Sequence, residues 1–396
     1  MLQKKKILFL IHTLQVGGAE KVLVNLVNNL DKNKYDITVM TVINTGAFRE
    51  ELSDEIKYET IFNIPGIKNK SKNTSHSGNI LNKTSVIKQI LLKLYGFFWR
   101  HANCKKIYKK YIKDNYDVEI AFLEGVATKI VSSSSNKTSK KIAWLHVDLM
   151  KETKTDKFFN SLNEEKKMYE RFDNIVAVSK IVKQQFIEKF SFKQTEKVIV
   201  KYNVINEKLI CQESKEELSI KKDKFTLCTI GRLASQKGYS RLLKIVKKLN
   251  EDGFIFDLWI IGVGPEEKIL KDFIQENNLK NVKMLGYQKN PYKYLKNSDI
   301  FVCSSIAEGF STVVSEAIIL GKPIITTDCA GMKEMLGDNN EYGIVTKNTE
   351  DDLYNGIKKV LLDKQVYDFY KKQVLKRKDM FSLKKAVLEV EKLIEE

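Results

Sequence analysis

IFVCSSIAEGFSTVVSEAIILGKPIITT, residues 300–327, sets the architecture of this chain. The apolar run at its start predicts a buried strand, and a polar loop that carries Glu308 and Gly309 follows it. A helix is predicted from near Ser311 to Gly321, because Ser is a favoured N-cap residue and Gly commonly ends a helix. A second apolar run follows the helix. The stretch therefore predicts a βαβ unit, the building block of a parallel sheet.

The N-terminus of this predicted helix is a candidate phosphate site. Ser311 can cap the helix, and the N–H groups from Thr312 onward then point out of an end where partial positive charge collects. Glu308 and Glu316 flank this end. Carboxylates accept hydrogen bonds, so their natural partners beside a phosphate are hydroxyl groups. Phosphate next to hydroxyl groups is the chemistry of a sugar nucleotide.

The same residues carry a family resemblance. The string from Glu308 to Glu316, followed by Ala-x3-Gly-x-Pro, resembles the Glu-x7-Glu signature of retaining glycosyltransferases of family 4, within glycosyltransferases group 1. The resemblance implies the GT-B fold, in which two Rossmann-like doubly wound parallel-sheet domains face each other across a cleft. It also implies that Gly309, Phe310, Ser311, Thr312 and Glu316 bind the donor.

Composition limits the class of protein. The 396 residues, 43% of them apolar, are enough for two domains with separate cores. The five cysteines are scattered and lack metal-binding spacing, which is typical of a reduced cytoplasmic protein. The apolar run Ile7–Ile11 is too short for a signal peptide, and no apolar run reaches the length of a membrane span. We therefore expect a cytoplasmic protein.

A glycine pair and a histidine are candidates in the first half of the chain. Gly17 and Gly18 lie between a predicted strand and helix, where glycines let a backbone approach a ligand; the pair alone is equally consistent with a tight turn. His146 ends the predicted strand 140–146, and alone it would more often be structural. The resemblance places the glycines against the donor diphosphate and the acceptor, and His146 beside the donor sugar.

A cationic loop follows the first predicted strand of the second half. Gly231 frees the backbone to turn, and Arg232 and Lys237 place two cations near one loop. The resemblance implies that both cations bind the diphosphate. A second glycine turn contains Gly264, which the resemblance places along the nucleotide; because no full Gly-x-Gly-x-x-Gly is present, a nicotinamide cofactor is a poor fit. Gln288 follows another strand and is a candidate contact for the base.

The domain boundary is predicted near Asn206. The resemblance implies that residues 1–206 form a Rossmann-like acceptor-binding domain and that residues 207–380 form a Rossmann-like domain for the nucleotide sugar. Residues 381–396 form a helix that, in GT-B enzymes, crosses back to the first domain.

The net charge of +18 requires an acidic partner. Between Thr60 and Lys113 there are twelve Lys or Arg residues and no Asp or Glu, so the basic stretch 63–113 concentrates this charge. We expect a mobile loop at 68–85, then a helix with apolar residues at 87, 90, 91, 94 and 98 on one face. Two interpretations remain open: the helix packs on the sheet with a solvated basic side, or 87–113 rests on an anionic membrane surface.

The mechanism must stabilise a departing diphosphate. Many transferases hold a metal for this with Asp-x-Asp, which this sequence lacks. Arg232, Lys237 and the helix N-terminus can replace a metal electrostatically, so we expect no metal and no cofactor beyond the nucleotide sugar. The predicted catalytic residues are Glu308, Arg232, Lys237 and His146. The resemblance implies that Glu308 orients sugar hydroxyls and Glu316 the ribose. Paired carboxylates of the glycosidase type are the competing interpretation.

The sequence thus favours a glycosyltransferase that moves a sugar from a nucleotide-sugar donor to a glycan or lipid-linked saccharide acceptor in surface polysaccharide synthesis, either free in the cytoplasm or peripheral on the inner face of the cell membrane. A sugar-nucleotide 2-epimerase of the same fold is an alternative enzyme. A basic nucleic-acid-binding protein is the non-enzymatic alternative, disfavoured because no nucleic-acid-binding module is recognisable.

Overall fold

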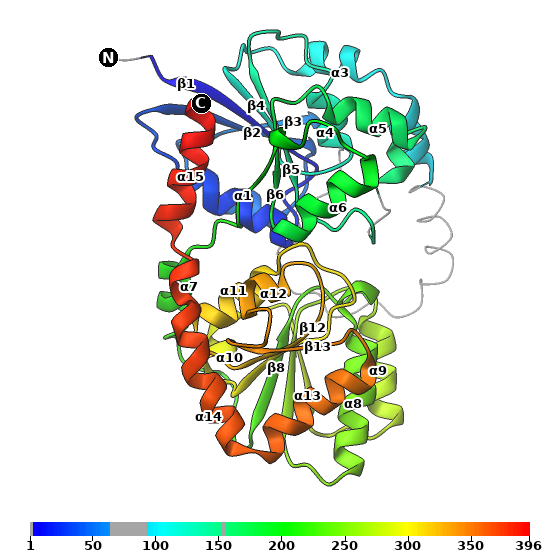
Figure 1. The fold of residues 1–396 in the computed structure, drawn as a ribbon, viewed down its shortest axis with the longest axis vertical. Coiled ribbons are helices and arrows are strands. Elements are labelled where there is room, and N and C mark those ends of the chain that lie inside the picture. The colour runs from blue at the N-terminus through cyan, green and yellow to red at the C-terminus, as the bar shows by residue number, and fades with distance from the viewer. Residues whose placement is uncertain (1–2, 64–92, 152–154) are drawn as a thin grey trace. The chain divides into compact units, whose positions relative to one another are not determined.

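The computed structural model describes residues 3–63, 93–151 and 155–396. The chain separates into two compact units (Figure 1). Unit 1 contains residues 1–178, 182–202 and 389–396, and unit 2 contains residues 179–181 and 203–388. The grouping of contacts therefore changes between Tyr202 and Asn203, close to the predicted boundary at Asn206. The acceptor and donor roles of the two domains stay predictions.

Unit 1 is built on a parallel sheet with strand order β3-β2-β1-β4-β5-β6-β7 in the described residues. Ile7–Ile11 of β1, an interior strand of this sheet, are completely buried. Such a continuous apolar run is expected where helices cover both faces of a parallel sheet. The strands are β1 (Lys5–Ile11), β2 (Tyr35–Ile43), β3 (Lys57–Phe62), β4 (Val118–Ala121), β5 (Lys140–Leu145), β6 (Asn174–Ala177) and β7 (Val198–Val200).

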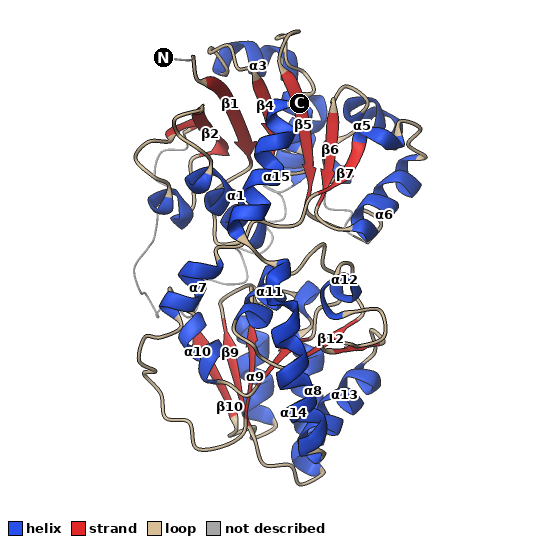
Figure 2. Ribbon diagram, turned by 60° about the vertical axis from the view of Figure 1, so that its left-hand side comes forward, coloured by secondary structure: helices blue, strands red, loops and turns tan. Residues whose placement is uncertain are grey.

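Helices connect these strands and lie on both faces of the sheet (Figures 1 and 2). Residues 93–101 are also helical. The α-helices are α1 (Gly18–Asn29), α3 (Cys104–Tyr111), α4 (Val126–Val131), α5 (Leu162–Tyr169) and α6 (Lys180–Phe190), and the 3-10 helices are η1 (Ala47–Glu51), η2 (Asp156–Phe158) and η3 (Thr195–Lys197).

Unit 2 repeats the plan with a parallel sheet in the order β10-β9-β8-β11-β12-β13. Its strands are β8 (Thr226–Ile230), β9 (Asp257–Ile261), β10 (Val282–Gly286), β11 (Ile300–Cys303), β12 (Ile324–Thr327) and β13 (Ile344–Thr346). Its helices are α7 (Glu207–Glu213), η4 (Ser235–Lys237), α8 (Tyr239–Glu251), α9 (Glu267–Glu276), α10 (Tyr292–Asn297), α11 (Thr312–Ile319), α12 (Met332–Leu336), α13 (Glu350–Leu362), α14 (Lys364–Gln373), η5 (Val374–Met380) and the start of α15 (Leu383–Glu395).

The main core of unit 2 lies between its sheet and the helices α8, α9 and α13 (Figure 2). Leu242, Val246 and Leu249 of α8 meet Leu270 of α9 and Ile357 of α13 in this core. The spacing of the α8 residues is that of one helical face, as the apolar pattern predicts. The opposite face carries α10 and α11, which contact β8, β11 and β12. Strand order and burial together confirm a second doubly wound domain.

Helix α15 starts in unit 2, and its last residues, Glu389–Glu396, belong to unit 1. The Lys5 ammonium at the start of β1 donates to Glu395 Oε2 (2.8 Å), and Lys140 Nζ at the start of β5 donates to the carbonyl oxygen of Leu393 (2.6 Å). The prediction that the final helix returns to the first domain is confirmed.

Some predicted elements differ from the structure. The loop at 68–85 and the predicted helix before residue 93 lie outside the described residues. On the described part of that helix, Leu94 and Phe98 are 58% and 49% exposed, which favours the second of the two open interpretations over packing of this face on the sheet. The buried side chain is Trp99 instead. Within the described ranges, no helix is both long and apolar enough to cross a bilayer.

Candidate active site

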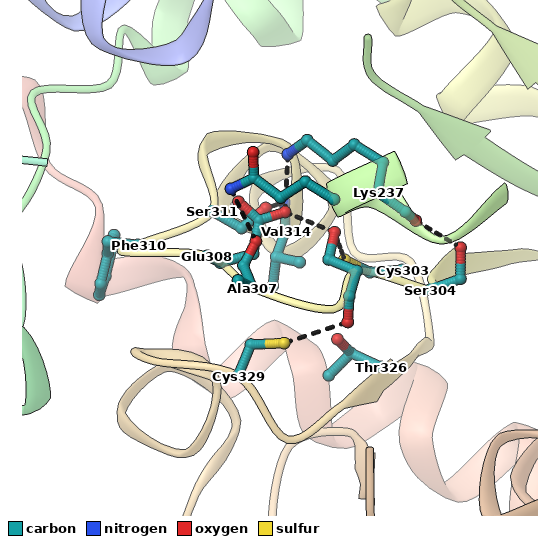
Figure 3. Close-up of polar contacts among 12 residues, drawn as sticks. Lys237, Cys303, Ser304, Ala307, Glu308, Phe310, Ser311, Val314, Thr326 and Cys329 are labelled. Carbon is teal, nitrogen blue, oxygen red and sulfur yellow. Dashed lines mark hydrogen bonds and ion pairs between the residues drawn. The ribbon is translucent and has the colours of Figure 1, made fainter. Parts of the chain in front are cut away.

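An ion pair joins two predicted catalytic residues in unit 2 (Figure 3). Lys237 Nζ lies 2.6 Å from Glu308 Oε1, and Ser305 Oγ donates to the same carboxylate oxygen. Burial alone would lower the pKa of Lys237, but the attraction of Glu308 outweighs it and the pKa is raised. The ammonium group is therefore charged at neutral pH.

Three further hydrogen bonds hold the Lys237 loop against the Glu308 loop. Ser304 Oγ donates to the carbonyl oxygen of Lys237 (2.8 Å), and the N–H of Ile306 donates to the carbonyl oxygen of Gln236 (2.7 Å). The Gln236 side-chain amide donates to the carbonyl oxygen of Ala307 (3.1 Å). The two loops leave neighbouring strands, β8 and β11, at their carboxyl ends, where parallel α/β sheets bind ligands.

Gly238 permits this close approach. Its φ of +66° lies in the left-handed region, and a Cβ atom there would be 2.1 Å from the carbonyl oxygen of Ser304. Any other residue would force the two loops apart.

Arg241 supports the Glu308 loop from α8, and the sequence analysis did not single it out. Its Nε donates to the carbonyl oxygen of Ser304 (2.8 Å), its Nη2 to that of Ser305 (2.6 Å), and its Nη1 to Asn348 Oδ1 (2.7 Å). Asn348 in turn donates to the carbonyl oxygen of Ile306 (2.9 Å). The guanidinium group thus fixes the backbone that leads to Glu308.

Arg232 directly follows Gly231 and is exposed. Among the described residues no carboxylate forms an ion pair with Arg232. Its positive charge has a small lowering effect on the pKa of Lys237. Two cations consequently share this end of the sheet with one paired carboxylate, Glu308. The arrangement is suited to an additional anion.

The N-terminus of α11 is formed as predicted. Ser311 Oγ accepts a hydrogen bond from the N–H of Val314 (3.4 Å), and Thr312 is the first helical residue. The preceding backbone is held by side chains: the carbonyl oxygen of Gly309 accepts from Ser179 Oγ (3.3 Å), and that of Phe310 accepts from Asn203 Nδ2 (3.0 Å).

Glu316 lies on the second turn of α11 and is 8% exposed. Its Oε1 accepts a hydrogen bond from the hydroxyl group of Tyr292 on α10 (3.2 Å). Tyr292 was not predicted, because it lies 24 positions from Glu316 in the chain and α10 carries no motif. The interaction fixes the orientation of the carboxylate, while its contact with a ribose stays a prediction.

The two predicted glycine turns pack backbone against backbone. A Cβ atom on Gly264 would lie 2.3 Å from the carbonyl oxygen of Leu233, and one on Gly262 would lie 2.0 Å from that of Gly231. The φ of Gly231 is +157°. The glycines are therefore required by the packing of the loops after β8 and β9, whether or not they also contact a nucleotide.

Gln288 lies after β10, and both ends of its amide are engaged within unit 2. Its Nε2 donates to the carbonyl oxygen of Leu285 (2.7 Å), and its Oε1 accepts from the hydroxyl group of Tyr294 (3.1 Å). The neighbouring Tyr287 is half exposed. A contact of Gln288 with the base stays a prediction.

In unit 1, Gly17 and Gly18 form the start of α1. Gly17 is the N-cap residue with extended backbone, and Gly18 is the first helical residue and exposed. A Cβ atom on Gly17 would lie 2.3 Å from Glu20 Oε2, so the Glu20 carboxylate folds back over the helix N-terminus. Carboxylates are stabilised in this position by the helix dipole.

His146 lies at the carboxyl end of β5, with its ring centroid 4.9 Å from that of Phe122. Burial lowers its pKa to about 3, against the opposite effect of a hydrogen bond to the Phe122 backbone. The imidazole is therefore neutral at pH 7. Its Nε2 is buried and has no hydrogen-bond partner in the described part of the chain. In the tautomer whose Nδ1 carries the proton, Nε2 is an acceptor available to a ligand.

Two residues at the neighbouring strand ends were not predicted. Glu124, after β4, accepts the backbone N–H groups of His146 and Val147 (2.9 Å to Val147). His12, after β1, stacks edge-on against Tyr95 with a centroid distance of 5.6 Å, and burial, followed by the charge of Lys157, lowers its pKa to about 4. Both residues follow buried strands, and polar residues in that position indicate a site at the carboxyl edge of the sheet. In unit 1, only His146 was predicted from this position.

Comparison with known proteins identifies the activity. Residues 211–377 match the family model described as Glycosyl transferases group 1. An enzyme of Campylobacter jejuni named N-acetylgalactosamine-N,N'-diacetylbacillosaminyl-diphospho-undecaprenol 4-alpha-N-acetylgalactosaminyltransferase is 27% identical over 381 residues, which span 95% of this chain and 96% of that protein. The protein is a glycosyltransferase. An uncharacterized glycosyltransferase of Methanocaldococcus jannaschii, MJ1059, is 31% identical over 58% of this chain and 61% of its own length.

Solved structures show the fold of this glycosyltransferase. Alr3699/HepE of Anabaena, in complex with UDP and glucose, is 19% identical and covers 99% of both chains with a TM-score of 0.72. A variant of S. aureus TarM, in complex with UDP and other ligands, is 14% identical and covers 99% of this chain and 100% of that one with a TM-score of 0.70. At these identities the likeness concerns the fold alone, and it confirms the GT-B architecture.

The family match includes the cationic loop and the α11 site of the glycosyltransferase. Arg232, Lys237, Glu308 and Glu316 all lie within residues 211–377. His146 and the Gly17–Gly18 turn lie outside this segment.

Proposed function

We propose that this glycosyltransferase moves a sugar from a nucleotide-sugar donor to a glycan or lipid-linked saccharide acceptor, with retention of anomeric configuration and without a metal ion. The observation that carries the proposal is the Lys237–Glu308 pair, held beside the exposed Arg232 and the capped N-terminus of α11. These groups offer two cations and oriented N–H groups to phosphate oxygens, and a carboxylate to sugar hydroxyls.

Electrostatic stabilisation of the leaving diphosphate is the main step. Breaking the bond to the anomeric carbon develops negative charge on the phosphates. Lys237 and Arg232 neutralise this charge, and the loop hydrogen bonds fix the position of Lys237 before the donor arrives, so little reorganisation is needed there. A divalent metal would perform the same task, and its Asp-x-Asp ligands are missing from the sequence.

Glu308 is better suited to orienting the sugar than to attacking it. Its Oε1 accepts from both the Lys237 ammonium and Ser305 Oγ, and these donors stabilise the carboxylate and reduce its nucleophilicity. The glycosidase-type interpretation requires a carboxylate that forms a covalent bond to the sugar. We instead assign the acceptor hydroxyl as the attacking group, on the face from which the diphosphate leaves, with a phosphate oxygen taking its proton.

His146 supplies an acceptor from unit 1. Its buried Nε2 has an unused lone pair, and burial keeps the ring neutral. A sugar hydroxyl that donates to this nitrogen would satisfy it. Glu124 holds the backbone of His146 in place for this contact.

The names of the relatives support a lipid-linked or surface-polysaccharide acceptor. The Campylobacter jejuni relative acts on a diphospho-undecaprenol-linked saccharide, and CapM of Staphylococcus aureus, 25% identical over 49% of this chain, is named for capsular polysaccharide biosynthesis. We extend this class of acceptor to the present protein, together with a place at the inner face of the cell membrane.

A ligand screen followed by a transfer assay tests the proposal. Thermal unfolding is measured with UDP, GDP and their sugar conjugates, because a ligand that binds only the folded state raises the Tm. The stabilising conjugate is then incubated with and without a polyprenyl-diphosphate saccharide, in EDTA and with Mn²⁺. We expect transfer in EDTA, with the anomeric configuration of the donor. Turnover to an isomeric sugar nucleotide without acceptor would identify an epimerase, and activity only with Mn²⁺ would refute metal independence.

A further inference from the structure

The helical residues 93–101 include one large buried side chain and three exposed apolar side chains. Trp99 is completely buried, whereas Leu94, Phe97 and Phe98 are 58%, 64% and 49% exposed. Exposed hydrophobic residues occur singly on most protein surfaces, and a cluster within one helical turn is unusual enough to require a reason.

The helix is held firmly, so this exposure is a feature of the folded protein. The Trp99 ring lies 6.0 Å from Phe62 at the end of β3. Lys129, only 3% exposed, donates from Nζ to the carbonyl oxygens of Trp99 (3.0 Å) and Arg100 (3.1 Å). A buried ammonium at the last carbonyls of a helix stabilises that helix end. Leu94 and Phe97 therefore remain exposed while the opposite side of the helix is fixed.

The surrounding charge has one sign. No Asp or Glu occurs from residue 93 to residue 113. The exposed cations of this segment are Lys93, Arg100, Lys105, Lys106, Lys109, Lys110 and Lys113. None of these seven forms an ion pair with a carboxylate in the described ranges, whereas on α9 Lys268 and Lys271 pair with Asp272 and Glu267. The charge of this segment is thus available to a partner.

The apolar and basic residues meet at Phe62. Its ring lies 6.3 Å from Phe98 and 5.6 Å from Tyr111, the last residue of α3. Lys110 lies over the Tyr111 ring, 5.1 Å from its centroid. On α3, Cys104 and Tyr108 are buried, and the four lysines between and after them are exposed. We call Leu94, Phe97, Phe98 and the seven cations the basic-aromatic face.

We propose that the basic-aromatic face docks on an anionic lipid bilayer. Leu94 and Phe97 enter the boundary between headgroups and acyl chains, and the lysines of α3 contact lipid phosphates through their long side chains. Each cation near an anionic surface adds to the attraction, which salt weakens. Nucleic acid would satisfy the charge, but exposed Leu94 and its aromatic neighbours are matched by acyl chains rather than by a phosphate backbone.

The proposal does not depend on the transferase reaction, and vesicle binding needs neither donor nor acceptor. Full-length protein is mixed with vesicles of phosphatidylcholine alone and of phosphatidylcholine with 30% phosphatidylglycerol, a composition chosen for the assay, and bound protein is measured by flotation. We expect binding to the anionic vesicles only, and a decrease as salt is raised.

Two variants test the two components. The first variant, Leu94→Ser with Phe97→Ser, removes two exposed apolar side chains. The second variant removes four cations and carries alanine at Lys105, Lys106, Lys109 and Lys110. Because each cation is expected to contribute a factor of roughly five, we expect the second variant to lose at least about 100-fold in partitioning. Both variants change exposed side chains, and unchanged thermal unfolding checks that they fold.

Matched controls come from unit 2. Ile255→Ser with Leu362→Ser removes two side chains that are 77% and 67% exposed. Alanine at the exposed Lys372, Lys376, Lys384 and Lys385 removes the same net charge as the α3 variant. We expect both controls to bind as the wild type does.

Three results would overturn the proposal. Equal losses in the unit 2 controls would show that net charge, not this face, causes binding. Equal binding to neutral vesicles would exclude an anionic surface as the partner. Tighter binding to single-stranded RNA than to anionic vesicles, lost in the α3 variant, would assign the face to nucleic acid.

Discussion

The predicted site residues at the strand ends of the two units differ in their hydrogen bonding. In unit 2, Lys237, Glu308 and Gln288 are each hydrogen-bonded within the unit. In unit 1, His146 Nε2 is buried without a partner in the described residues, and so, away from the strand ends, is Glu165 Oε1 on α5. Buried polar groups normally find partners. We infer that the Lys237–Glu308 site is organised before a ligand binds, whereas Nε2 of His146 is left for a ligand or water to satisfy.

The largest expected effect comes from breaking the paired site. Lys237→Met and Glu308→Gln should each lower kcat/KM by roughly 10²- to 10³-fold, because each removes a preorganised electrostatic group. The double variant should lose little more than either single variant, since the two side chains act as a unit. Steady-state transfer rates for the three variants measure this coupling. Fully multiplicative losses would mean that the pair seen in the structure is irrelevant to the reaction.

Arg241→Lys tests whether the paired site depends on its backbone support. Lysine cannot donate to the carbonyl oxygens of Ser304 and Ser305 and to Asn348 at once, so the Glu308 loop should shift. A misplacement of about 1 Å can cost up to about 100-fold, and we expect a loss of roughly 10- to 100-fold in kcat with a smaller change in KM.

Arg377 is the matched control for Arg241. It donates to the carbonyl oxygens of Met335 (3.0 Å) and Glu334 on α12. Arg377→Lys should destabilise the protein by a similar amount, measured by urea unfolding, and leave kcat unchanged. If both variants lose activity in proportion to stability, Arg241 has only a general structural role.

The buried carboxyl of Glu165 in unit 1 should appear in the pH dependence of stability. Burial, with smaller effects from neighbouring charges, raises the pKa of Glu165 to about 7, so its stabilising contribution is full below pH 4.5 and is lost as pH rises through 7. Glu165→Gln mimics the protonated form, and its stability relative to the wild type should rise between pH 5 and pH 8 by roughly 2–3 kcal/mol. Denaturant unfolding across this range is the measurement. A constant difference would show that Glu165 is paired.

The smallest effect is expected at His146. His146→Phe keeps a ring against Phe122 and removes the Nε2 acceptor, so kcat/KM should fall about tenfold, as for one hydrogen bond. Because the pKa values of His146 and His12 are lowered to about 3 and about 4, neither should produce an inflection in the wild-type rate between pH 5 and pH 8. A full rate in the variant would remove His146 from the site.

The sequence was sufficient for the fold because its signals are local. The βαβ unit at residues 300–327 was predicted correctly, since apolar runs mark β11 and β12 and Ser311 and Gly321 mark the limits of α11. The three-residue strand β13 was missed because so short a run has no recognisable period. The orientation of residues 93–101 stayed open, because an apolar stripe has the same spacing whether it packs on a sheet or faces outward.

The supporting residues of the site were not predictable for a different reason. Arg241, Tyr292 and Glu124 act through backbone atoms or side chains that lie far away in the chain or carry no motif. Arg241 and Ser304, for example, are 63 positions apart. Such contacts form only when the sheet is assembled, so the local spacing of residues in the sequence does not predict them.

The last turn of α15 has a consequence for biosynthesis. It contacts the starts of β1 and β5 through Lys5–Glu395 and Lys140–Leu393, so unit 1 joins two stretches of the chain that unit 2 separates in sequence. Domains generally fold as units during synthesis, but these contacts cannot form before residue 395 has been made. We therefore expect nascent unit 1 to lack them until that residue has left the ribosome.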